Sequence, residues 1–176
     1  MRPLKFRPIL KPLLWGGDKI ASYKGIATDL RHIGESWELS GVQGAESVVC
    51  SGDYDGYKLS ELIAELKETL VGHSVYRRFG TEFPLLVKFI DARQDLSIQV
   101  HPNDTLSRLR HGKNGKTEMW YVVDADKGAH LRSGFSQQVS PEEYERHVAD
   151  HTLTEVLRDY KAVSYTHLTL PTTSRV

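Results

Sequence analysis

The residues with the clearest chemical potential lie in a short segment where polar and apolar side chains alternate. In Ser97-Ile98-Gln99-Val100-His101, a hydroxyl, an amide and an imidazole occupy every second position. In a β-strand, Ser97, Gln99 and His101 would point to one face, and Ile98 and Val100 would point to the other. An amide oxygen and a neutral imidazole nitrogen on one face are competent ligands for a divalent metal ion.

Lys116 and Glu118 form a second polar pair further along the chain. They are two residues apart and share one face of an extended segment with Trp120 and Val122. A carboxylate beside the amide and imidazole gives three protein ligands, which with one open position is the pattern of a catalytic zinc site. The spacing alone also allows a plainer interpretation, in which His101 merely ends a strand and the second pair is a solvated ion pair worth about 0–1 kcal/mol.

Composition limits the classes of protein to consider. The chain has 176 residues, of which 39% are hydrophobic and 26% charged, which is enough for one domain with a buried core. Lys and Arg number 23, as do Asp and Glu, so no net positive charge favours a nucleic-acid partner. The single cysteine, Cys50, cannot form an internal disulfide, and no apolar run approaches the ~20 residues of a membrane helix. We therefore expect a cytoplasmic protein without a membrane partner, and its oligomeric state stays open.

The segment 163–176 differs in composition from the rest of the chain. It contains no acidic residue and is rich in threonine. It resembles the translation of a sequencing adaptor, and segments of this kind are set aside when a fold is considered. We therefore expect Ala162 to be the last native residue and residues 1–162 to be the N-terminal part of a longer domain. The alternative is a short polar terminal strand.

Hydrophobic periodicity and turn residues predict a mainly β chain with inserted helices. Glycines and prolines divide residues 1–57 into short strands and turns. Leucine and isoleucine at helical spacing predict a helix over residues 59–71. Ser140 and Glu143, on either side of Pro141 at the first helical position, form a capping box. Strands are expected over 84–90, 96–101, 116–123 and 129–135, the first two adjacent, and further helices over 141–148 and 154–161.

Several motifs, in this order and spacing, resemble those of the type I phosphomannose isomerases. The two polar segments carry the likeness, as Ser-Ile-Gln-Val-His-Pro at 97–102 and Gly-Lys-Thr-Glu-Met-Trp-Tyr at 115–121. Trp-Gly-Gly at 15–17, Gly-Glu-Ser-Trp-Glu-Leu at 34–39 and Phe-Pro-Leu-Leu-Val-Lys-Phe-Ile at 83–90 extend it. The motifs are highly specific, and the resemblance covers the chain from Phe6 to about Tyr160.

The resemblance implies a cupin-type jelly-roll β-barrel, incomplete in this chain, with a metal at its mouth. It implies that Gln99, His101 and Glu118 bind one zinc ion, or another divalent first-row metal. The family also has a fourth metal-binding histidine, followed by a glutamate and an arginine that act at the sugar, and these have no counterpart in this sequence. We therefore expect the chain alone to lack a complete active site.

The resemblance also implies roles at the substrate. Lys116 and Ser97 match a lysine and a serine of the substrate pocket, and Lys88 and Glu35 correspond more loosely to residues that line the active site. The implied activity is the interconversion of mannose 6-phosphate and fructose 6-phosphate, so the expected partner is a small sugar phosphate.

Such an isomerisation moves a carbonyl between C1 and C2 of the sugar. One carbon must lose a proton and the other must gain one, and a divalent cation near the two oxygens stabilises the negative charge that develops. The sequence does not assign the base. Two other functions stay open, a non-catalytic cupin that binds a sugar phosphate and a cupin oxygenase, although oxygenases more often present several histidines.

Overall fold

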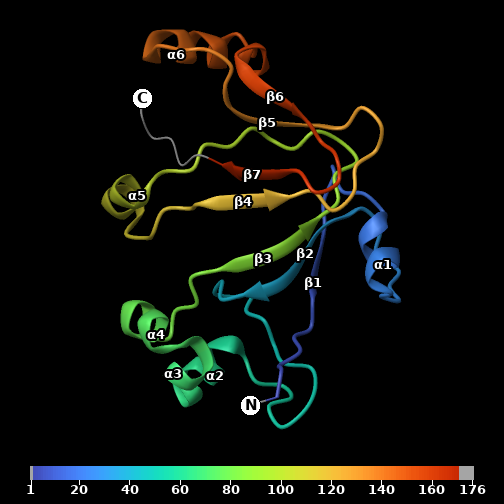
Figure 1. Ribbon diagram of the computed structural model, residues 1–176, viewed down its shortest axis with the longest axis vertical. Coiled ribbons are helices and arrows are strands. Elements are labelled where there is room, and N and C mark those ends of the chain that lie inside the picture. Colours follow the sequence, from blue (N-terminus) through green and yellow to red (C-terminus); the bar gives the residue numbers. More distant parts are fainter. Residues whose placement is uncertain (1, 171–176) are drawn as a thin grey trace. The chain divides into compact units, whose positions relative to one another are not determined.

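The computed structural model describes residues 2–170 (Figure 1). The chain divides into two compact units, residues 1–97 (unit 1) and residues 98–176 (unit 2). Each unit contains both helices and strands, so the chain is a mixed α and β protein rather than a mainly β one. None of the helices in the described part of the chain is long and apolar enough to cross a membrane.

Unit 1 contains a three-stranded antiparallel sheet. The strands are β1 (Ile9–Pro12), β2 (Ile33–Ser40) and β3 (Leu86–Ile90), and β2 lies in the centre. Trp37 on β2 is opposite Ile9 on one side and Lys88 on the other. The central strand therefore brings side chains from three distant parts of unit 1 onto one face of the sheet.

The opposite face of this sheet is in contact with helix α1 (Lys19–Lys24). The Lys24 ammonium donates a 3.3 Å hydrogen bond to the Ser36 hydroxyl and lies 5.4 Å from the centre of the Phe89 ring. Because alternate residues of a strand face opposite sides, Ser36 and Glu38 point toward α1 while Glu35 and Trp37 point away from it.

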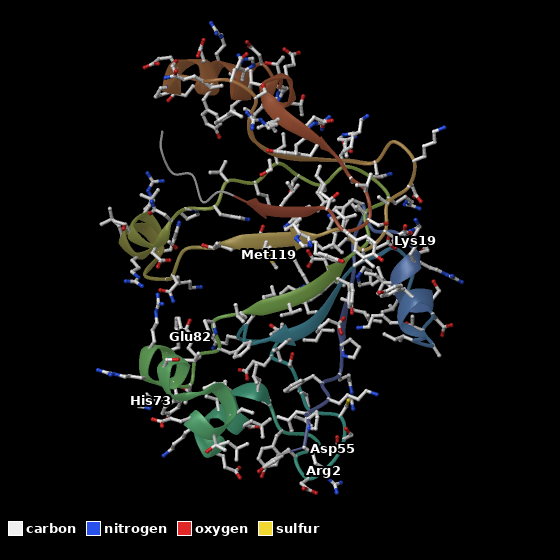
Figure 2. All side chains as sticks on the ribbon, viewed as in Figure 1. Arg2, Lys19, Asp55, His73, Glu82 and Met119 are labelled. Carbon is white, nitrogen blue, oxygen red and sulfur yellow. The ribbon has the colours of Figure 1, made fainter. Side chains whose placement is uncertain are left out.

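Three short helices follow the sheet's central strand along the sequence. They are α2 (Leu59–Leu66), α3 (Glu68–Val71) and α4 (His73–Phe79), and His73 is labelled in Figure 2. The helix predicted over 59–71 is interrupted at Lys67, whose φ of 49° is left-handed and ends α2. The predicted apolar face is confirmed at Leu59, Leu62 and Ile63, which are buried in the core of unit 1.

Unit 2 contains two separate two-stranded antiparallel sheets. In one sheet, β4 (Glu118–Tyr121) pairs with β7 (His167–Leu170). In the other, β5 (His130–Phe135) pairs with β6 (Leu157–Lys161). Its helices are α5 (Asp104–His111), α6 (Pro141–Ala149) and a 3-10 turn over Leu153–Glu155.

The predictions for the beginning of unit 2 are partly wrong. No strand covers 96–101 in the part of the chain that the structure describes, and Ile98 and Val100 are exposed rather than packed on an apolar face. The strand predicted next to it, β3, pairs with β2 instead. Apolar periodicity does not predict helix α5, because few apolar residues lie within it.

The predictions for the end of unit 2 are mixed. Helix α6 is confirmed, with the Ser140 hydroxyl accepting from the Glu143 N–H and the Glu143 carboxylate accepting from the Ser140 N–H. The helical stretch predicted over 154–161 is wrong, because most of it forms β6 and pairs with β5. Tertiary pairing here overrides a local pattern that lacks a helix cap.

The segment 163–176 is only partly within the described residues. Residues 167–170 form β7, and residues 171–176 lie outside the described part. That the segment is not native stays a prediction. Across the described residues the strands form three small sheets, none of which closes on itself, so the jelly-roll barrel expected from the resemblance is not confirmed.

Removal of a core side chain from α2 tests the packing of unit 1. Leu62 is fully buried, so Leu62→Ala should lower the free energy of unfolding by about 2–5 kcal/mol. Leu14 is 92% exposed, so Leu14→Ala should change it by less than about 0.5 kcal/mol. Urea unfolding followed by tryptophan fluorescence measures both values, and equal losses would contradict this assignment of the core.

Candidate metal and substrate site

Three of the predicted site residues come together in unit 2. The His101 Nε2 atom lies 3.3 Å from Glu118 Oε2, and the Lys116 Nζ atom lies 2.7 Å from Glu118 Oε1. Lys116 Nζ is also 3.4 Å from His101 Nε2. The side chains of His101 and Glu118 are 19% and 16% exposed, so the carboxylate is largely withdrawn from water but has a positive and a polar neighbour. The imidazole, ammonium and carboxylate thus form one cluster.

Strand β4 positions the carboxylate of this cluster. Glu118 is its first residue and alternates with Met119, which is 74% exposed and labelled in Figure 2. Glu118 and Trp120 therefore share the less exposed face of β4. Lys116 precedes Glu118 by two residues, and its side chain reaches the same carboxylate, as the alternation predicts.

The chemistry of the cluster fits a divalent metal. Two ligand atoms that are each about 2.1 Å from a tetrahedral zinc ion lie about 3.4 Å apart. The 3.3 Å between His101 Nε2 and Glu118 Oε2 is close to that separation. No group of three or more His, Cys, Asp or Glu side chains is placed to hold a metal among the described residues. A complete protein ligand set within this region therefore needs a donor of another type, such as the predicted amide of Gln99.

Of the other predicted residues, Gln99 belongs to unit 2, where it is exposed and lies outside any strand, whereas Ser97, Glu35 and Lys88 belong to unit 1. Lys88 Nζ lies 2.6 Å from Glu35 Oε1, and the Trp37 indole N–H donates to Glu35 Oε2 at 2.7 Å. The ammonium of Lys11 lies 4.6 Å from the centre of the Trp37 ring, within cation–π range. Ser97 ends unit 1 at an exposed position.

Glu35, Trp37 and Lys88 form a second charged group, on the sheet face that points away from α1. Each carboxylate oxygen of Glu35 has a donor, which stabilises its ionised form. The sequence identified Glu35 and Lys88 but not the orienting roles of Trp37 and Lys11. The alternation in β2 places Trp37 on the same face as Glu35. The position of Lys11 on that face depends on the pairing of β1 with β2, which the sequence does not show.

A pocket of about 280 Å³ also lies in unit 1. It is lined by Ile9, Lys11, Gly44, Ala45, Glu46 and Lys58. None of the predicted site residues lines it, and its one carboxylate already accepts a 2.5 Å hydrogen bond from the Ser60 hydroxyl. The two charged clusters, rather than this pocket, are therefore the candidates for chemistry.

Comparison with known proteins gives a consistent set of relatives. Residues 4–131 match the family model described as phosphomannose isomerase type I, catalytic domain. The mannose-6-phosphate isomerase of Bacillus subtilis is 39% identical over 80% of this chain and 43% of its own length. That of Streptococcus mutans is 37% identical over 88% of this chain and 48% of its own length.

Solved structures agree with these matches. The crystal structure of the mannose 6-phosphate isomerase from Bacillus subtilis superposes with a TM-score of 0.85 and 30% identity, covering 97% of this chain and 53% of that one. The structure of a putative mannosephosphate isomerase from Archaeoglobus fulgidus gives a TM-score of 0.79 and 26% identity, covering 96% of this chain and 54% of that one. The chain thus spans about half the length of the relatives it matches.

The ion pair of unit 1 gives a test of its energetic role. Lys88 and Glu35 are 22% and 15% exposed, so Lys88→Met should leave a poorly solvated carboxylate and cost about 1–3 kcal/mol of unfolding free energy. Adding Glu35→Gln removes that charge, so the double variant should lose less than the sum of the two single variants.

The matched control is the exposed pair of His73 and Glu68, whose side chains are 71% and 52% exposed. Its coupling energy should be below about 0.5 kcal/mol. Urea unfolding of the two double-mutant cycles measures both couplings. Strictly additive losses at Lys88 and Glu35 would show that the pair is not a coupled unit.

Proposed function

Because the chain belongs to the type I phosphomannose isomerase family, we propose that the whole protein interconverts mannose 6-phosphate and fructose 6-phosphate. The observation that carries the proposal is the cluster of His101, Lys116 and Glu118, which unites the two motif segments in one place. The relatives of similar sequence are named mannose-6-phosphate isomerases, which supports the same reaction.

Gln99, His101 and Glu118 would hold a divalent metal, with zinc as the first candidate. Imidazole, carboxylate and amide oxygen are donors that zinc accepts, and the separation of His101 and Glu118 is of the right size. When bound, such an ion supplies a Lewis acid beside the two sugar oxygens between which the carbonyl moves. The contribution of Gln99 rests on its match to the family motif, because Gln99 is exposed and no strand covers residues 96–101 in the described part of the chain.

Lys116 would hold the substrate. Its ammonium lies 2.7 Å from Glu118 and is half exposed, so it can reach a sugar hydroxyl or a phosphate oxygen while it stays close to the cluster. Ser97 would add a neutral hydroxyl donor, and Glu35 and Lys88 would line the active site. We expect the proton-transferring base to come from the part of the protein outside residues 1–162.

We propose the jelly-roll barrel of the cupins for the complete protein. The match to the Bacillus subtilis enzyme over 97% of this chain supports it. The sheets of each unit are open in the described part of the chain, and the remaining part of the protein would supply further strands.

Metal binding by the chain separates the roles of Glu118 and Lys116. Glu118→Ala should abolish stoichiometric binding of Zn²⁺ or Co²⁺, because it removes a ligand. Lys116→Ala should leave the metal bound, because it removes only a neighbouring cation. Equilibrium dialysis with metal analysis measures both, and Glu145→Ala, an exposed glutamate in the same unit, is the control for loss of one carboxylate. A Lys116 variant that loses the metal would contradict this division of roles.

The activity itself is tested with mannose 6-phosphate and a coupled assay for fructose 6-phosphate. We expect the protein encoded by the uninterrupted reading frame to isomerise the sugar, and Glu118→Ala in it to lower kcat/KM by at least about 10³-fold on loss of the metal. The chain of 176 residues should show little or no turnover. A complete protein that binds both metal and sugar phosphate without isomerisation would favour the binding function instead.

A further inference from the structure

The cluster in unit 2 is built from two segments that no sheet joins. Strand β4, which begins at Glu118, pairs with β7, and the structure has no strand over 96–101 within its described range. A ladder between neighbouring strands therefore does not set the distance between His101 and Glu118. Residues 102–115 connect the two segments, and they contain the contacts that bring the ends together.

The ends of this connection are joined directly. The backbone N–H of Gly115 donates to Asp104 Oδ1 at 2.9 Å, and the N–H of Lys116 donates to the carbonyl of Pro102 at 3.4 Å. Pro102 follows His101 in the sequence, and Lys116 is itself part of the cluster. These two hydrogen bonds hold the first and the last residues of the connection side by side.

Helix α5, within the connection, adds a second layer of bonds. The Ser107 hydroxyl donates to the carbonyl of Asn114 at 3.0 Å. The Arg108 guanidinium donates from Nη2 and Nε to Asn114 Oδ1 at 3.0 and 3.3 Å. Asn103 begins the helix by accepting from the Leu106 N–H. Ser107 is 5% exposed, so the Ser107 end of this bond is buried, whereas Asn114 lies at the surface.

Gly115 makes this closure sterically possible. A Cβ atom at Gly115 would lie 2.6 Å from the carbonyl carbon of Asn103 and from the backbone nitrogen of Asp104. Such contacts are with backbone and cannot be relieved by rotation of a side chain. Gly112 differs, because its φ of 64° ends α5 in a left-handed conformation and a Cβ atom there would meet no heavy atom within 4 Å.

We propose that residues 102–115 form a clasp that positions His101 against Lys116 and Glu118, with Asn114 and Gly115 as its positioning residues. This inference rests on the proposed function, since it gives the clasp the task of fixing the metal-binding geometry. Outer residues that orient metal ligands typically affect affinity by about 10–100-fold. Opening the clasp should therefore weaken metal binding without removing any ligand.

The test compares Co²⁺ binding by four variants, measured as the visible absorption of the bound ion. Asn114→Ala removes the acceptor of Arg108 and should weaken binding about tenfold, whereas Asn114→Asp keeps an acceptor and should bind at least as tightly as the wild type. Gly115→Ala should weaken binding more than tenfold. Gly112→Asn, at a position where Asn tolerates left-handed φ, should stay within about threefold.

A second measurement makes the result independent of the metal. In the metal-free protein, a nuclear Overhauser contact between the His101 ring and the Glu118 side chain should be present in the wild type and Asn114→Asp and lost in Asn114→Ala. Wild-type protein that binds no Co²⁺ but follows this pattern would overturn the metal site and leave the clasp standing. Equal Co²⁺ affinity and equal Overhauser contacts in Asn114→Ala and the wild type would overturn the clasp, even where Gly115→Ala fails to fold.

Discussion

A carboxylate that is mostly withdrawn from water must be met by donors or cations, and Glu118 is under this constraint. His101 approaches one of its oxygens from an earlier segment of the chain, and Lys116, two residues before Glu118, approaches the other. Burial of the carboxylate without them would cost several kcal/mol, so folding of this region and assembly of the cluster depend on each other. The need to compensate the charge of Glu118 is therefore enough to bring these three side chains together, without a bound ligand.

The same constraint organises unit 1. The sheet there carries Glu35 on one face, compensated by Lys88 and the Trp37 indole. The other face carries Glu38, which is paired with Lys24 from α1. Alternating residues of β2 thus present charged groups to opposite sides, and each charge has a partner on a different element. The face that contacts α1 thus carries both an ion pair and the ring contact of Tyr23 with Phe89.

The predictability of these features from sequence differs with the kind of signal. The alternation of polar and apolar residues was sufficient to predict the contact of Lys116 with Glu118, because the two residues are only two positions apart. The alternation over 96–101 was not sufficient to predict a strand, because a strand also needs a partner with a free edge, which the sequence does not show. The capping box at Ser140 located α6 correctly because it is a local hydrogen-bond motif.

Longer-range determinants escaped the sequence for physical reasons. The positive φ of Lys67 divides the predicted helix, and no glycine or proline at that position signals the break. Residues 157–161 form a strand because β5 offers its edge, although nothing in their own order requires it. The contact of Glu35 with Lys88 was similarly absent from the sequence pattern, because Lys88 lies across the sheet on β3.

The interior of unit 1 differs from that of unit 2, and this difference bears on how the candidate site is built. Unit 1 buries apolar side chains such as Leu62, Ile63 and Val49, whereas Val156 is the only hydrophobic residue of unit 2 that is buried among those the structure describes. Around the candidate site, polar contacts join Glu118 to His101 and Lys116, and such contacts weaken steeply with distance and angle. A site that must hold ligand atoms within about 0.5 Å gains from supporting contacts of this kind.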